Sequence, residues 1–228
     1  ARFRNEAYIQ ASVQHPHIAA LYEYTVDNGT PCIIMEYVEG ITLEKLIKRQ
    51  SRLPESFVWK IFEQIVLAVA HLHSQNIIHR DLKPSNLMIV ETGRKKERVV
   101  KIVDFGISKI LPHGRFPGQD LTSAGDVVGS PLYMSPEQCL GRTVDARSDI
   151  YSLGVTFFET LTGEPPFVAR SAVEIKHMHQ SEPTPILNEV VEGGNFSPAV
   201  QAVLERMMAK DPDMRYQTME NVCSDLIA

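Results

Sequence analysis

Apolar residues recur every three to four positions between residues 57 and 72, a spacing that predicts a long helix with one buried face. Pro54 stands before this stretch and marks the expected start of the helix. The apolar positions that share the face are Phe57, Ile61, Ile65, Ala68 and Leu72.

A second stretch, residues 148–163, is apolar nearly all round and stops at a glycine. This pattern is typical of a helix buried in the centre of a domain, with Gly163 at its C-terminal end. Three further helices have capping signals. Thr42 is expected to cap a short helix through Ile47, Ser197 precedes a proline at a first helical position, and Thr218 is placed to cap the last helix.

Strand-like runs rich in β-branched and aromatic residues cover residues 22–26 and 32–38, and the sequence DNGTP between them predicts a turn. We expect an antiparallel hairpin there, and a small strand insert within residues 77–106. A helical pattern over residues 1–13 starts without a cap, which indicates a fragment of a longer chain. Helix, two strands and then mostly helices form an α+β pattern with segregated elements.

Composition narrows the class of protein. The chain has 228 residues, 43% of them hydrophobic and 22% charged, and a formal net charge of −5. This is ordinary for a globular protein and disfavours nucleic acid as the main partner. Its three cysteines are far apart in the sequence and suggest neither disulfides nor zinc, so a reducing, cytoplasmic location is expected. No apolar run is long enough to span a bilayer, and no signal peptide opens the chain.

Candidate chemistry is concentrated in residues 77–90, where polar side chains interrupt an otherwise apolar stretch. Asp81, Lys83 and Asn86 lie within it, and Asp104 follows on the next strand-like run. If the two runs pair as a hairpin, two carboxylates, an amide and an ammonium converge. Hard oxygen ligands of this kind suit Mg²⁺.

These residues belong to motifs that resemble the signature set of protein kinases. The motifs are HRDLKPSN at 79–86, DFG at 104–106, GSPLYMSPE at 129–137 and DARSDIYSLG at 145–154, followed by DPDMRY. The resemblance implies the two-lobed kinase fold. Residues 1–38 would be a partial small lobe, with the regulatory helix, two strands and the hinge, and residues 39–228 an essentially complete helical lobe.

The resemblance also implies catalytic roles. Asp81 would accept or orient the proton of the substrate hydroxyl, and Lys83 would neutralise charge on the transferring phosphoryl group. Ser130 would bridge these two residues. Asn86 and Asp104 would hold Mg²⁺ beside ATP.

Further roles concern the nucleotide. Glu6 matches the helix glutamate that pairs with a phosphate-gripping lysine. Backbone groups of Glu36 and Val38 would meet the adenine, and Met88 would lie beneath it.

The same resemblance assigns structural and regulatory roles to further residues. Glu137 and Arg215 match an ion pair that anchors the end of the activation segment, and Asp149 is a structural carboxylate. Arg80 precedes the catalytic aspartate as in kinases that are switched by phosphorylation, which makes Thr122 and Ser123 the candidate phosphosites. Lys83 followed by Pro84 resembles Ser/Thr kinases, and the sequences RFRNEA, VDARSDIYSLG and TGEPPF resemble the bacterial Ser/Thr kinases of the eukaryotic type.

The expected activity is therefore transfer of the γ-phosphoryl group of ATP to Ser or Thr hydroxyls of proteins, with a homodimer for trans-autophosphorylation as a further candidate partner. The Gly-rich loop and the third-strand lysine are absent from the 228 residues. We expect this polypeptide alone to transfer phosphate negligibly, and the parent chain could carry a membrane anchor. Two alternatives remain: a pseudokinase scaffold and a small-molecule phosphotransferase of kinase-like fold.

Overall fold

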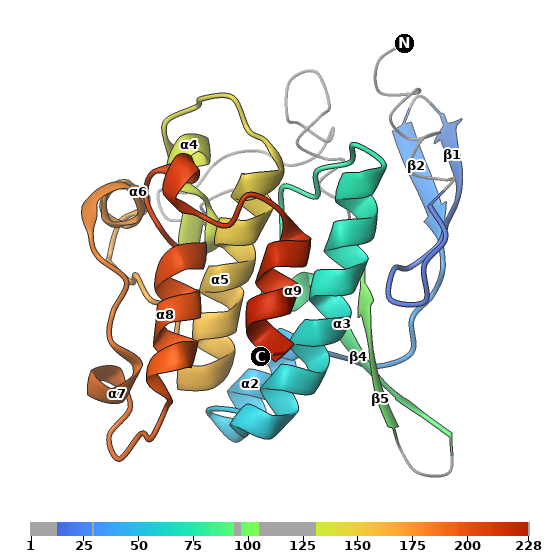
Figure 1. Cartoon of the computed structure of the whole chain (residues 1–228). Coiled ribbons are helices and arrows are strands. Elements are labelled where there is room, and N and C mark those ends of the chain that lie inside the picture. Colours follow the sequence, from blue (N-terminus) through green and yellow to red (C-terminus); the bar gives the residue numbers. More distant parts are fainter. Residues whose placement is uncertain (1–12, 29, 94–96, 105–130, 228) are drawn as a thin grey trace.

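The computed structural model describes residues 13–28, 30–93, 97–104 and 131–227. The helix expected at residues 1–13 lies almost wholly outside them. Figure 1 shows a body of helices with a β-hairpin standing at one side. The strands are β1 Leu21–Asp27, β2 Thr30–Met35, β3 Ile41–Thr42, β4 Leu87–Thr92 and β5 Glu97–Ile102. The α-helices are α2 Leu43–Gln50, α3 Glu55–Ser74, α4 Pro136–Cys139, α5 Ala146–Thr162, α6 Ala172–Ser181, α7 Leu187–Val190, α8 Pro198–Met207 and α9 Met219–Ile227, and short 3₁₀ turns lie at Pro84–Asn86, Pro131–Tyr133 and Pro212–Met214.

Helix α5 is the centre of the helical body, as its composition predicts. Its residues from 148 to 161 are all buried, and α3 and α8 pack beside it, while α9 packs against α3 and α8 (Figure 1). The helix ends at Gly163, which has a φ of 95°, and a Cβ atom there would collide with the carbonyl oxygen of Ser51. A glycine is therefore required at this close approach.

The expected helix caps are confirmed. The hydroxyl of Thr42 accepts from the Lys45 amide at 3.2 Å, and that of Ser197 accepts from the amide three residues on. Thr218 does the same for α9. Two details differ from the prediction. Helix α2 continues to Gln50, and Phe57 is only partly buried because it lies at the rim of the core, with the guanidinium of Arg98 4.7 Å from its ring centre.

The predicted hairpin is confirmed, with β1 and β2 antiparallel and Thr25 opposite Cys32. Its second strand ends at Met35, however, and not at residue 38 as expected. The Glu36 amide still donates to Ala20 O at 2.7 Å, but the Ala20 amide donates to the Glu36 side chain at 3.1 Å, so the backbone pairing is not continued beyond this point. The apolar pattern alone did not reveal this side-chain contact.

A second sheet has the order β3-β4-β5 and confirms the small strand insert. Leu87 pairs with Ile102 across β4 and β5, which brings the two ends of the catalytic motifs together. The two-residue strand β3 was not predicted, because such a short strand has no recognisable pattern. Among the described residues, no helix is both long enough and apolar enough to cross a bilayer. Segregated sheets and helices place the chain in the α+β class.

Candidate active site

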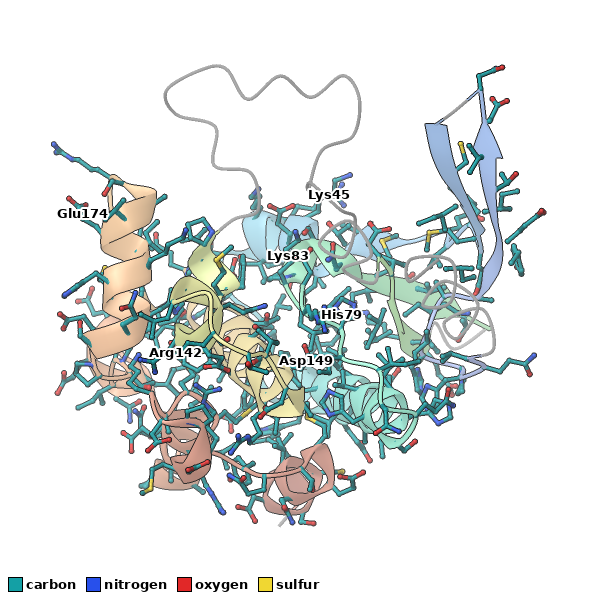
Figure 2. All side chains as sticks on the ribbon, turned by 90° about the horizontal axis from the view of Figure 1, so that it is seen from above. Lys45, His79, Lys83, Arg142, Asp149 and Glu174 are labelled. Carbon is teal, nitrogen blue, oxygen red and sulfur yellow. The ribbon has the colours of Figure 1, made fainter. Side chains whose placement is uncertain are left out.

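The loop after α3 is held by one buried carboxylate, that of Asp149 on the first turn of α5. Its two oxygens accept the backbone amides of His79 and Arg80, both at 2.8 Å. The Nε2 atom of His73 also lies 2.8 Å from the carboxylate. Figure 2 shows His79 and Asp149 side by side in the middle of the molecule. Arg80 adopts a φ of 66°, an unusual conformation that these hydrogen bonds hold in place.

The carboxylate of Asp81 sits between an ammonium and an amide. Lys83 Nζ lies 2.8 Å from Asp81 Oδ2, and both side chains are 22% exposed. Asn86 Nδ2 donates to the same oxygen at 3.0 Å and to the Asp81 carbonyl at 2.8 Å. The 3₁₀ turn Pro84–Asn86 produces this arrangement by folding Asn86 back toward Asp81. The predicted convergence of these three residues is therefore observed.

The Asn86 amide nitrogen is used by Asp81, which leaves Oδ1 as the Asn86 atom that suits a metal ion. Asp104, two residues after the end of β5, is brought toward Asn86, because the amide of the preceding residue Val103 donates to the Asn86 carbonyl at 2.9 Å. Asp104 is exposed and has a φ of 55°. An amide oxygen and a carboxylate are the hard donors that Mg²⁺ prefers, so the residues present fit this ion.

The expected hinge segment begins at Glu36, whose carboxylate forms an ion pair with Lys101 at 2.6 Å and accepts from the Ala20 amide at 3.1 Å. Burial opposes ionisation of Glu36, but the hydrogen bonds from Lys101 and Ala20 outweigh it and lower its pKa. Since the Glu36 amide is used by Ala20, its carbonyl is the group suited to the expected adenine contact. Val38 lines a cavity of about 630 Å³ beside the hinge, whereas Met88 lies opposite Lys101 in the sheet.

The ion pair expected between Glu137 and Arg215 is present and buried. Two guanidinium nitrogens each lie 2.8 Å from one carboxylate oxygen, and the Ser148 hydroxyl also donates to Glu137. The Arg215 side chain is 0% exposed. Burial raises the pKa of Glu137, but the hydrogen bonds from Arg215 and Ser148 outweigh burial and leave it below its usual value.

The family model for the protein kinase domain matches residues 1–227 of this chain. The chain belongs to the protein kinase family. It is 40% identical to the serine/threonine-protein kinase PknB of Mycolicibacterium smegmatis, over 99% of this chain and 35% of the relative. It is 38% identical to PknB of Mycobacterium tuberculosis, over 99% and 35%, and 38% identical to the serine/threonine-protein kinase PrkC of Bacillus subtilis, over 99% and 33%. This kinase chain thus spans about a third of the length of these relatives.

Four residues to which the family likeness gives roles lie outside the described residues. These are Glu6, Thr122, Ser123 and Ser130. Their roles stay predictions.

Sequence reasoning missed several residues that position the kinase site. His73, whose Nε2 contacts Asp149, was not among the candidate residues. Gln138 donates from its side chain to the Arg80 carbonyl at 3.1 Å and completes a capping box with Ser135. The pattern Ser-Pro-Glu-Gln is a capping-box signal that could have revealed this pair. The Lys101–Glu36 pair is 65 residues apart in sequence and left no such signal.

Glu159, on α5, was also missed. It is 7% exposed and accepts a hydrogen bond from the Tyr133 hydroxyl at 2.6 Å. Burial raises its pKa to about 7, partly offset by the Tyr133 hydrogen bond, while Glu44 adds to the rise and Lys48 opposes it. Its carboxyl group therefore titrates near neutral pH.

A raised pKa means that the folded kinase holds this proton more tightly than the unfolded chain does. The resulting stability is full below pH 4.5 and is lost as pH rises through about 7. We expect the wild type to lose about 2–3 kcal/mol of unfolding free energy relative to Glu159→Gln between about pH 4.5 and pH 8. Urea unfolding across this range measures the difference. Glu174→Gln on the exposed face of α6 is the control, and parallel pH profiles for wild type and Glu159→Gln would contradict the assignment.

Proposed function

We propose that this domain is a protein Ser/Thr kinase that transfers the γ-phosphoryl group of ATP to serine or threonine hydroxyls of proteins. The observation that carries the proposal is the fixed carboxylate of Asp81, held 2.8 Å from Lys83 Nζ and 3.0 Å from Asn86 Nδ2. Family membership and the printed names of the relatives support the same reaction.

Asp81 is suited to receive the hydroxyl proton because its carboxylate lies between two donors and one fifth of it is exposed. Lys83 is placed to balance negative charge that develops on the phosphoryl oxygens. Asn86 Oδ1 and the Asp104 carboxylate would hold Mg²⁺, which supplies charge neutralisation for the phosphates when it is bound. Asp149, through the amides of His79 and Arg80, keeps the loop in position for transfer.

ATP would bind along the hinge, with the carbonyl of Glu36 and the backbone of Val38 at the adenine and Met88 beneath it. Ser130 would bridge Asp81 and Lys83 in the assembled site, and Glu6 would orient a phosphate-binding lysine.

Regulation would act on Thr122 or Ser123, phosphorylated by a second copy of the protein. We place the domain in the cytoplasm, where ATP and protein substrates are available. We also propose that the natural full-length protein acts on protein substrates.

The experiment compares acceptors. The natural full-length protein is incubated with Mg-ATP labelled at the γ-phosphate and with a generic protein substrate, a tyrosine-only peptide or an aminoglycoside. We expect label on serine and threonine of the protein. Label confined to the aminoglycoside would favour a small-molecule phosphotransferase, and binding of ATP without label on any acceptor would favour a scaffold.

A further inference from the structure

A cavity of about 650 Å³ lies between the end of α4, the C-terminal end of α6 and the segment that follows α8. Figure 2 shows Arg142, on the loop after α4, well apart from Lys83 on the catalytic loop. None of the described residues between 81 and 104 lines the cavity, so it is distinct from the proposed phosphoryl-transfer site. Its polar and charged lining residues are Glu137, Arg142, Thr143, Gln180 and Lys210.

The lining has a surplus of positive charge. Glu137 supplies its carboxylate, which is neutralised by both guanidinium nitrogens of Arg215 at 2.8 Å. Within the described part of the chain, neither Arg142 nor Lys210 forms an ion pair. Lys210 Nζ instead lies 3.3 Å from the Tyr151 hydroxyl and 4.4 Å from the centre of the Phe167 ring.

A chain of hydrogen bonds holds the Lys210 ammonium in place. Lys210 donates to the Tyr151 hydroxyl, which lies 2.9 Å from His179 Nδ1, and His179 Nε2 lies 3.0 Å from the Leu132 carbonyl. The carbonyl can only accept, so Nε2 carries the proton and Nδ1 accepts from Tyr151. Burial lowers the pKa of His179 to about 4, in agreement with this neutral ring. The ammonium is therefore fixed before any ligand arrives.

Burial makes the protonated form of Lys210 less stable than it would be in water. Burial, with Arg215 nearby, lowers the pKa of Lys210 to about 8, so the group is still mostly protonated at neutral pH. An anion in the cavity would relieve this cost. Two cations, a hydroxyl and an amide together match a ligand with several acceptor oxygens and two negative charges.

We propose that this cavity binds a phosphate group, free or as a phosphate monoester, with Lys210 and Arg142 as its cationic contacts. The cavity volume leaves room for the organic part of a monoester. A phosphorylated residue and free phosphate share this chemistry, and the probes below separate them.

The test is calorimetric titration of the natural full-length protein at pH 7 with inorganic phosphate and with O-phosphoserine, and serine as the reference that lacks the phosphate group. We expect both phosphates to bind and serine not to bind. Tighter binding of O-phosphoserine identifies a monoester site, and equal or tighter binding of inorganic phosphate identifies a site for the free anion. Failure of both to bind at millimolar concentration overturns the proposal.

Matched variants locate the binding. Lys210→Met should weaken it about tenfold or more, and Arg142→Gln about threefold or more, since each removes a charge-assisted hydrogen bond. The control Lys60→Met, at an exposed position of α3, should leave the affinity within about twofold.

Lys83→Met separates this site from the proposed ATP site, and it should also retain wild-type affinity for phosphate. Loss of phosphate binding in Lys83→Met, or unchanged affinity in Lys210→Met, overturns the proposal. If circular dichroism shows that Lys210→Met is unfolded, Arg142→Gln decides alone, because Arg142 is exposed and its replacement leaves the core intact.

Discussion

Replacing Glu137 by alanine is expected to lower the free energy of unfolding by about 3–5 kcal/mol, the cost of leaving a buried charge without its partner. The Arg215 side chain is 0% exposed and would lose both of its 2.8 Å contacts with the carboxylate. It would keep the carbonyls of Ala209, Arg147 and Lys210, which satisfy three of its five N–H groups, and the other two N–H groups and its charge would be left uncompensated.

Urea unfolding of the purified chain measures this loss. Glu174→Ala is the matched control, because that glutamate is exposed on α6, and it should change stability by less than about 0.5 kcal/mol. A loss below about 1 kcal/mol in Glu137→Ala would show that the pair is not the buried anchor described above.

The second large effect concerns catalysis. Asp81→Asn keeps the shape of the side chain and an oxygen to accept from Asn86, but it cannot receive a proton. We expect the rate of phosphoryl transfer to fall about 10²–10⁴-fold, the usual contribution of a positioned general base. The unfolding free energy should change little, because the Asp81 side chain is partly exposed and its ion-pair partner, Lys83, is partly exposed as well.

Steady-state kinetics of the natural full-length protein with a protein substrate give the rate, and a thermal melt checks the fold. Asp27→Asn, an exposed aspartate at the end of β1, serves as the control and should keep full activity. Wild-type turnover by Asp81→Asn would remove Asp81 from the proposed mechanism.

Local features of the fold could be read from the sequence because their causes lie within a few residues. The hydroxyls of Thr42, Ser197 and Thr218 each accept from the backbone amide three residues ahead, and Gly163 ends α5 in the left-handed conformation that favours glycine. The hairpin of β1 and β2 likewise depends on an adjacent turn.

The supports of the site could not be read in this way. Asp149 contacts the amide of His79 across 70 residues, and His179 reaches the Leu132 carbonyl across 47. A single sequence shows no signal for such pairs. The Glu137–Arg215 pair, 78 residues apart, was anticipated only because the motifs resemble a family in which that pair occurs. Convergence of Asp81, Lys83 and Asn86 was the exception, since all three lie in one short loop.

The most direct test of the account is mass spectrometry of the natural full-length protein after incubation with Mg-ATP, with wild type and Asp104→Ala compared. If Asn86 and Asp104 hold the metal ion beside Asp81 and Lys83, the wild type will gain phosphate, with Thr122 or Ser123 as the expected positions, and Asp104→Ala will gain none. Equal phosphorylation of the two proteins would contradict the central claim.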